Sequence, residues 1–271
     1  MKAKVSPVRA FAPGVVLFFL FLWSVFRFDD IAFLLAPLAP GKRLFVERTS
    51  LAVLAGQHLV LSLGTTIASF ALAFPLGVLA ASSRSGAWSR LADRAGSFGE
   101  TFPTVALMAL LVPVVGYGAS PVWLALTLYG VLPILRGTVT GLHGVPPGTI
   151  DSARGMGMTP SQLLRLVRLP LAMPHVLQGL RIGLVVNISA ATVGAAVGAG
   201  GFGVPIVSGI RSFDTLLILK GSIPVALLAL SADSLVRGGE KMMKVESARV
   251  RDTTTSFAYE TAPHGSDASA T

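Results

Sequence analysis

The sequence has no cysteine and few charged residues, and each shortage excludes a class of protein. Without cysteine there are no disulfides, thiolate metal sites or cysteine nucleophiles. Only 13% of the 271 residues are charged, whereas a soluble domain carries about a quarter. Hydrophobic residues make up 52% of the chain, and the mean hydropathy is +0.71. This composition is that of an integral membrane protein.

The sequence also lacks the patterns of an enzyme. The four histidines are scattered, with no spacing typical of a metal site or a catalytic triad. No Gly-x-x-x-x-Gly-Lys-Ser/Thr pattern is present, so there is no phosphate-binding loop of that type for ATP. We therefore expect no catalytic residue, no metal site and no cofactor bound by this chain.

Long apolar runs are what the sequence has instead. A membrane helix needs about 20 mostly apolar residues to cross about 30 Å of hydrocarbon. We therefore predict an all-α membrane protein with about six spanning helices. They are expected roughly over residues 11–28, 57–81, 102–117, 121–140, 177–199 and 219–236. The apolar run 31–39 is too short to span and is interrupted by proline, so it is expected at the interface.

The basic residues give these spans an orientation. The net charge is +9, and the segment 136–181 holds five arginines against one acid, Asp151. The stretches 2–9, 84–94 and 237–244 are also basic. With six spans all four segments lie on one side, which the positive-inside rule makes cytoplasmic, together with both termini. Anionic headgroups explain this charge better than nucleic acid does.

The chain divides into three expected regions. Residues 1–56 would hold the first helix and an external connection, and residues 57–240 the main transmembrane domain. Residues 241–271 are expected to be a disordered cytoplasmic tail, since Ser, Thr and Asp are frequent and large apolar residues few. The first helix has a second interpretation, a signal peptide, because basic residues precede it. Its length and the loop alternation favour a retained helix.

A compact basic segment, 150–170, lies between the fourth and fifth expected spans. Prolines 146 and 147 stop the incoming helix. Residue 148 or 149 can then cap a short helix that carries Asp151 in its first turn, where the helix dipole favours an acid. Gly155 and Gly157 are expected to weaken and end this helix.

A second helix is expected to start at once. Thr159 is a candidate N-cap, and Pro160 and Gln162 follow at the positions that suit a first helical residue and a capping box. Arg165 and Arg168 are three residues apart and are expected on one helix face. Proline 170 is expected to close the segment.

The basic segment is thus predicted as two short helices along the membrane surface, with a tip of small residues over 152–157. One interpretation is a helix that lies among lipid headgroups. The other is a docking surface for a cytoplasmic partner. The glycine-punctuated tip favours docking, because a lipid anchor would carry Trp, Phe or Leu there.

The basic segment resembles the EAA loop of permease subunits in binding-protein-dependent ABC importers. In that loop Glu-Ala-Ala is followed at fixed spacing by Gly, by Ile and by Leu-Pro. The spacing is kept here, with Asp151, Ser152, Ala153, Gly157, Val167, Leu169 and Pro170 at the matching positions. Asp for Glu, Ser for Ala and Val for Ile are the departures. The resemblance implies that these residues form a coupling helix seated in a groove of an ATPase.

The likeness covers roughly residues 58–240 and favours one branch of the family. The runs "LPILRGTVTGLHGVPPGTIDSARGMGMTP" and "GLRIGLVVNISAATVGAAVGAGGFG" are similar to permeases of osmoprotectant importers. The resemblance implies a MetI-like core that transports a compound such as glycine betaine or choline across a bacterial cytoplasmic membrane. The partners that it implies are two cytoplasmic ATPase subunits, which bind ATP and Mg, a second permease subunit and an external binding protein.

Two other functions stay open at this point. The same architecture could carry an amino acid such as methionine. An ion-coupled carrier or channel would need no ATPase, but such proteins often bury ionisable residues at mid-membrane, and the predicted spans contain few.

Two further groups of residues are candidates for the transport path. Asn187, followed by Thr192 in the fifth expected span, must find a polar partner at that depth. It either bonds a neighbouring helix or lines the substrate path. The run Gly200, Gly201, Phe202 and Gly203 is too glycine-rich for a regular helix and is expected to be an external gate or a plain connection. His58, at the outer end of the second span, is expected at the interface.

Overall fold

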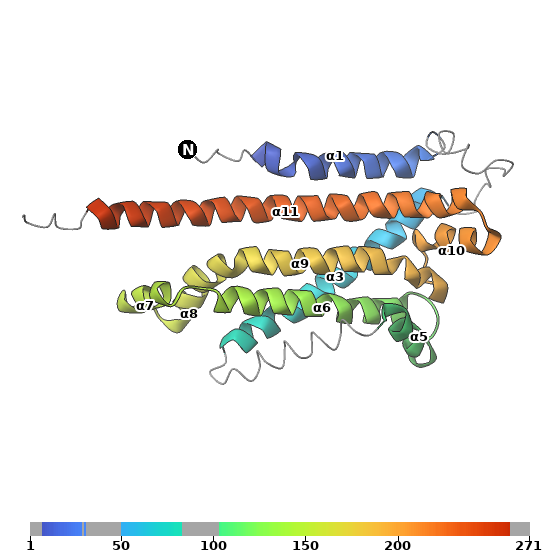
Figure 1. Cartoon of the computed structure of the whole chain (residues 1–271). Helices are drawn as coiled ribbons and strands as arrows, with labels where there is room; N and C mark the ends of the chain where they lie inside the picture. Colours follow the sequence, from blue (N-terminus) through green and yellow to red (C-terminus); the bar gives the residue numbers. More distant parts are fainter. Residues whose placement is uncertain (1–6, 29, 31–49, 83–102, 261–271) are drawn as a thin grey trace, which may run out of the picture.

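The computed structural model describes residues 7–28, 30, 50–82 and 103–260, with side chains described up to Met243. Every regular element in these residues is a helix (Figure 1). In chain order they are α1 Pro7–Phe26, α3 Leu51–Ser82, α5 Thr104–Val115, α6 Ala119–His143, α7 Pro147–Gly155, α8 Pro160–Gln162, η2 Leu163–Arg168, α9 Leu169–Ala191, η3 Val193–Val197, α10 Gly203–Ser212 and α11 Thr215–Glu260.

Five of the described helices are long and apolar enough to cross a membrane. They cover Val8–Phe26, Leu51–Ser82, Ala119–His143, Pro160–Ala191 and Thr215–Met243. A helix satisfies its backbone hydrogen bonds internally, which is why long runs with few charges adopt this form in lipid. Five of the six predicted spans overlap these helices, and the all-α prediction is confirmed.

The third predicted span, 102–117, is the exception. Its described part is α5, a helix of 12 residues, which is about 18 Å long at 1.5 Å per residue. This is shorter than the hydrocarbon core of about 30 Å. The helix stops after Val115 because Gly116 and Gly118 adopt positive φ angles of 83° and 116°. Residues 31–39, expected at the interface, lie outside the described residues.

The fifth predicted span, 177–199, lies closer to the N terminus than expected. The helix runs from Pro160 to Ala191. After Ala191 the chain tightens into the 3₁₀ helix η3, and Gly198 ends that turn with φ 86°. The small, glycine-rich residues that follow Ala191 therefore leave the spanning helix.

The long helices lie side by side, with α1, α6, α9 and α11 roughly aligned and α3 crossing them (Figure 1). A Cβ at Gly130 of α6 would touch Ser69, and one at Gly77 of α3 would touch Thr138, so α3 and α6 run in the same direction. Helix α9 runs opposite to α6, because Gly183 faces Gly130 whereas Ala172 faces Gly141.

This arrangement gives the bundle two distinct ends. Helices α7 and α8 lie at one end, which we call the α7 end, and α5 and α10 lie at the other, the α10 end (Figure 1). Helix α11 continues past the α7 end to Glu260. It thereby enters the segment that the sequence led us to expect as a disordered tail.

Glycines set the closest helix contact, between α6 and α9. A Cβ added at Gly179 would lie 2.4 Å from the carbonyl oxygen of Pro133. At Gly137 it would lie 2.5 Å from the carbonyl oxygen of His175. Two backbones can approach this closely only where side chains are missing, as is typical of membrane helices.

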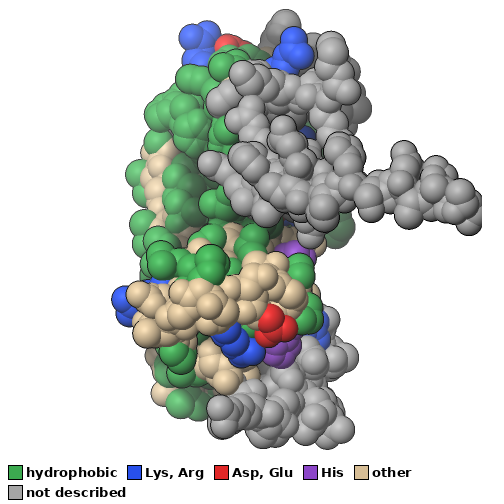
Figure 2. Space-filling view, turned by 90° about the vertical axis from the view of Figure 1, so that its left-hand side faces the viewer, with side chains coloured by type: hydrophobic (Ala, Val, Ile, Leu, Met, Phe, Trp, Pro, Cys, Tyr) green, Lys and Arg blue, Asp and Glu red, His purple; other side chains and the backbone are tan. Residues whose placement is uncertain are grey.

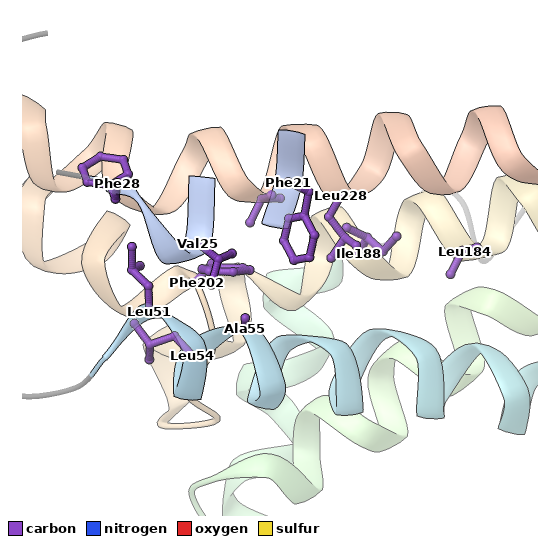
Figure 3. Close-up of a cluster of buried hydrophobic side chains, with 11 residues drawn as sticks. Phe21, Val25, Phe28, Leu51, Leu54, Ala55, Leu184, Ile188, Phe202 and Leu228 are labelled. Atoms are coloured by element: carbon purple, nitrogen blue, oxygen red, sulfur yellow. The ribbon is translucent and has the colours of Figure 1, made fainter. Parts of the chain in front are cut away.

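A cluster of buried apolar side chains joins α1, α3, α9 and α11 toward the α10 end (Figure 3). At its centre the rings of Phe21 and Phe202 meet edge to face, with centroids 6.2 Å apart. Both are fully buried, at 1% and 0% exposed. Ile188 and Leu228 pack beside them. The cluster fixes the turn after η3 against four spanning helices.

Candidate functional site

Helix α7 begins earlier than predicted. Its first residue is Pro147 and its N-cap is Pro146, with no side-chain capping bond. The predicted cap at residue 148 or 149 is therefore wrong, and Asp151 lies beyond the first turn. Proline at the first helical position is favoured because its fixed φ suits the helix and its missing N–H is not needed there. Asp151 instead pairs with Arg154 at 3.4 Å on the exposed face.

Helix α7 ends as predicted, at Gly155 and Gly157. The N–H of Met158 donates to the Ala153 carbonyl at 3.2 Å, and that of Gly157 donates to the Arg154 carbonyl at 2.9 Å. These two bonds define a Schellman motif, whose penultimate residue needs a left-handed conformation. Gly157 supplies it, with φ 80°. The sharp turn between α7 and α8 thus depends on this glycine.

The start of α8 also follows the prediction. The Thr159 side chain accepts a hydrogen bond from the Gln162 backbone, and the Gln162 side chain accepts one from the Thr159 N–H at 2.9 Å. Pro160 occupies the first turn. This capping box satisfies two backbone donors at once. We call the capped unit 147–162 the α7–α8 hairpin.

The predicted stop at Pro170 is wrong. The helix that starts at Pro160 continues through Leu163–Arg168 and α9 to Ala191 without a break. Residues 163–168 adopt the wider π form, in which the Leu169 N–H donates to the Leu164 carbonyl. A π turn changes the hydrogen-bond register of the backbone. Proline, which lacks an N–H and clashes with the carbonyl four residues back, is therefore accommodated.

The π turn also separates two arginines that were expected on one face. In an α-helix, residues three apart share a face, but the different register of a π turn changes that relation. Here Arg165 is exposed, whereas Arg168 is partly buried and donates from Nη2 to the Leu142 carbonyl at 3.2 Å. Arg168 therefore does not contribute to the predicted basic flank.

The α7–α8 hairpin presents a mixed surface at the α7 end (Figure 2). Met156 in the turn is 72% exposed, and Leu166 just beyond the hairpin is 65% exposed. Arg154 and Asp151 lie beside them as an exposed ion pair. Ala153 faces inward and is 2% exposed. The hairpin thus presents exposed apolar side chains beside an ion pair on a rigidly capped unit.

The seven residues of the predicted coupling motif all lie at this end, in different environments. They are Asp151, Ser152 and Gly157, exposed on the hairpin, Ala153, buried beneath it, Val167 and Leu169, partly buried, and Pro170, exposed at the start of α9. Their role in coupling stays a prediction.

Asn187 is fully buried and bonds a neighbouring helix. Its Nδ2 donates to Thr66 Oγ1 of α3 at 3.0 Å, while its Oδ1 has no hydrogen-bond partner among the described residues. Thr192 bonds within its own chain segment, to the Ser189 carbonyl at 2.6 Å. Of the two roles left open for Asn187, this conformation contains the interhelical bond.

The glycine-rich run 200–203 forms a tight turn between η3 and α10. Gly200 and Gly201 have φ angles of 83° and 75°. The Gly201 N–H donates to Gln57 Oε1 at 2.9 Å. Phe202 is fully buried, and Gly203 begins α10. The turn is thus packed against the start of α3, and its role as a gate stays a prediction.

His58 was expected at the interface, and this is wrong. It is fully buried, and its Nε2 donates to the Ile188 carbonyl at 3.0 Å. Its ring lies 5.3 Å from that of Phe202. The preceding residue, Gln57, accepts a hydrogen bond from the glycine-rich turn. This part of α3 is therefore packed inside the bundle.

Sequence reasoning missed a charged network between α9 and α11. Arg181 pairs with Asp233 at 2.9 Å and with Glu240 at 2.9 Å. The pair with Glu240 is an ionic contact without hydrogen-bond alignment, since neither atom has a hydrogen bond to any described residue. Asp233 also pairs with Arg237, four residues further along α11. The sequence feature that could have revealed this network is Arg181, which lies inside a predicted span. A charged residue at that depth usually pairs with an opposite charge on a neighbouring helix.

The fold and the site define a class: a multi-pass, all-α membrane protein with an exposed helical hairpin between two of its spans. The chain belongs to the family described as "Binding-protein-dependent transport system inner membrane component", which it matches over residues 73–244. It is thus a transport permease subunit.

Three relatives show the range of similar proteins. A choline transport system permease protein of Bacillus subtilis is 35% identical over 187 residues, which cover 69% of this chain and 85% of the relative. A carnitine transport permease protein of Listeria monocytogenes is 38% identical over 189 residues, covering 69% and 83%. An osmoprotectant import permease protein of Salmonella typhimurium is 36% identical over 191 residues, covering 69% and 88%.

Among solved structures, the fold is similar to that of the MetNI methionine ABC transporter in an inward-facing conformation. The TM-score is 0.57 at 26% identity, and the match covers 67% of this chain and 92% of that chain. An amino acid ABC transporter with histidines shares the fold, with a TM-score of 0.51 at 18% identity and coverage of 70% and 94%.

Proposed function

We propose that this chain is the membrane-spanning subunit of an ATP-driven importer for a small osmoprotectant such as glycine betaine, choline or carnitine. One observation carries the proposal. Relatives named for choline, carnitine and osmoprotectant transport each match about two thirds of the chain and most of their own length. The transported compound would carry a quaternary ammonium group, as these compounds do, or a similarly compact cationic group.

We expect the α7–α8 hairpin to be the contact with a cytoplasmic ATPase subunit, which would bind ATP and Mg. Three features support this role: the two caps that fix the hairpin, the exposed Met156, and the exposed Asp151 and Ser152. A second permease subunit, an external substrate-binding protein and the bilayer of the cytoplasmic membrane are the other expected partners. Both termini would then lie in the cytoplasm.

Uptake measurements test the substrate. The chain is expressed with its ATPase and binding protein in cells that lack their own osmoprotectant and methionine importers. We expect accumulation of labelled glycine betaine, choline or carnitine and none of labelled methionine or histidine. Uptake of an amino acid alone would contradict the proposed substrate while leaving the family assignment intact.

An amino acid such as methionine is the second candidate, because the methionine transporter has a similar fold at 26% identity. The named relatives at higher identity favour an osmoprotectant. The same uptake panel separates the two candidates. An ion-coupled carrier would take up substrate without hydrolysing ATP, so vanadate, which traps ABC ATPases, would leave its uptake unchanged.

A pair of glycine substitutions tests the hairpin. Gly157→Val forces a β-branched side chain into the left-handed region, which costs about 1–2 kcal/mol and should distort the turn. Gly155→Ala is the control, because no atom lies within 4 Å of its added Cβ. We expect Gly157→Val to lower uptake and substrate-stimulated ATP hydrolysis together, and Gly155→Ala to leave both unchanged. Normal uptake by membrane-inserted Gly157→Val protein would contradict the role of the hairpin.

A further inference from the structure

Arg168 faces the interior of the α7 end, away from the exposed hairpin surface. Its Nη2 donates to the Leu142 carbonyl at 3.2 Å, and its Nε is buried without a hydrogen-bond partner in the part of the chain that the structure describes. Leu142 is in the last turn of α6, where carbonyls have no partner within the helix. A cation at this place also meets the negative end of the helix dipole. The contact therefore ties the end of α6 to the helix that carries the hairpin.

The contact lies where the hydrogen-bond pattern of that helix is irregular. Arg168 is the last residue of the π turn, and Pro170 follows almost immediately. π turns in helices are rare and occur mostly as single turns at functional sites. Proline removes one further backbone hydrogen bond. Without a brace, a force on the hairpin would bend the helix here instead of moving α9.

Three spanning helices meet beneath Arg168. Ala81 of α3, Leu142 of α6 and Ala172 of α9 form one buried cluster. Leu164 and Leu169, on either side of the π turn, pack against it. A Cβ at Gly141 would lie 2.7 Å from the Ala172 carbonyl oxygen, so α6 and α9 are in backbone contact here. A displacement that reaches this cluster is passed to all three helices.

We infer that Arg168 is a positioning residue for coupling, which braces the π turn against the end of α6. With the brace in place, a displacement of the α7–α8 hairpin moves α6 and α9 together. Without the Arg168 contact, the hairpin would move and α6 and α9 would not follow it. The inference rests on the proposed function in one respect, namely that an ATPase acts through the hairpin.

The first experiment measures coupling in the whole transporter, reconstituted in liposomes with its ATPase and binding protein. Arg168→Gln removes the charge, Arg168→Lys keeps a cation with donors, and Arg165→Gln removes an exposed arginine of the same turn as a control. The readout is the amount of labelled glycine betaine or choline imported per ATP hydrolysed. We expect Arg168→Gln to lower this ratio about tenfold, as for the loss of one charge-assisted hydrogen bond, with ATP hydrolysis retained.

Arg168→Lys should recover most of the ratio, because an ammonium can still donate to a carbonyl at the helix end. Arg165→Gln should leave the ratio unchanged. An unchanged ratio in Arg168→Gln would overturn the inference, as would an equal loss of uptake and ATP hydrolysis. A wild-type transporter that imports neither compound would instead overturn the proposed function, and leaves the second experiment valid.

The second experiment needs neither substrate nor ATPase. The chain contains no cysteine, so Thr140→Cys on α6 and Ser161→Cys on α8 introduce two defined labelling sites. Both positions are exposed. Spin labels report their distance distribution in lipid nanodiscs. We expect a broader distribution in Arg168→Gln and an unchanged one in Arg165→Gln. Equal distributions in both would overturn the brace even if transport is affected.

Discussion

Asn187 illustrates how a single polar side chain is kept inside the bundle. It is 0% exposed and bonds Thr66 across the α3–α9 contact. Four hydroxyl side chains on the same face of α3, those of Ser62, Thr65, Thr66 and Ser69, each bond a carbonyl of their own helix. Ser69 Oγ also lies 2.8 Å from the Thr127 carbonyl of α6. This buried polar face is therefore satisfied mostly by bonds within α3, and Ser69 and Asn187 add bonds to two neighbouring helices.

A double-mutant cycle measures that bond. Asn187→Leu and Thr66→Val each remove one partner, and the coupling between them should be about 0.6 kcal/mol, the usual size for such pairs in membrane proteins. The measurement is equilibrium unfolding in mixed detergent micelles. No coupling, together with a raised KM for uptake in Asn187→Leu, would show instead that the amide serves the substrate path.

Arg181 should matter far more for stability than its neighbour Arg237. Its side chain is 18% exposed and stands between Asp233 and Glu240. Arg181→Met leaves buried acid without compensation, which costs about 3–5 kcal/mol. Arg237→Gln breaks a pair in which Arg237 is 53% exposed, and such pairs contribute about 1 kcal/mol or less.

The same unfolding assay compares these variants with a double variant that should restore stability. Adding Glu240→Gln to Arg181→Met removes the carboxylate that is 8% exposed, and much of the lost stability should return. If Arg181→Met were as stable as the wild type, the network would have no structural role.

At the scale of helices, the α6–α9 contact depends on missing side chains. Gly179→Ala would place a methyl group 2.4 Å from the Pro133 carbonyl oxygen, and relieving this clash should cost about 1–3 kcal/mol. Gly56→Ala is the matched control in α3, with no atom within 4 Å of the new Cβ. There the better helix former should add up to about 1 kcal/mol. Thermal unfolding in detergent tests both, and equal melting temperatures would contradict close packing at Gly179.

Element boundaries were predictable where a local rule decides them. The end of α7 at Gly155 and Gly157 and the capping box at Thr159 need only neighbouring residues, and both were predicted from the sequence. Pro170 was not, because a π turn absorbs it and no local pattern signals that turn. The prediction that Arg165 and Arg168 share a face was wrong for the same reason, because the π turn places Arg168 against Leu142.

Tertiary contacts decided what local rules could not. His58 looked interfacial from its place in the second span, but Gln57 and Phe202 draw it into the bundle. The partners of Arg181 lie on another helix, so only the packing of α9 on α11 reveals them. The third predicted span likewise had the composition of a membrane helix, and two positive-φ glycines set where α5 ends.

For the whole molecule, the two ends of the bundle differ in chemistry. The α7 end carries the exposed hairpin, and Arg154 and, beyond the hairpin, Arg165 are exposed there. The α10 end carries exposed aromatic residues, Tyr117 at 81% and Phe213 at 87%. Basic residues set the orientation of a membrane protein, whereas aromatic residues gather at both membrane boundaries. The basic residues favour a cytoplasmic α7 end.

Cysteine labelling tests this orientation directly, because the natural chain contains no cysteine. Ser152→Cys marks the α7 end, Tyr117→Cys marks the α10 end, and Ala73→Cys is a control at a position that is 0% exposed. A membrane-impermeant maleimide applied to spheroplasts should label Tyr117→Cys alone. In inside-out vesicles it should label Ser152→Cys alone, and Ala73→Cys should stay unlabelled in both. Labelling of Ser152→Cys from outside would place the hairpin away from the cytoplasm, where no ATPase subunit could reach it.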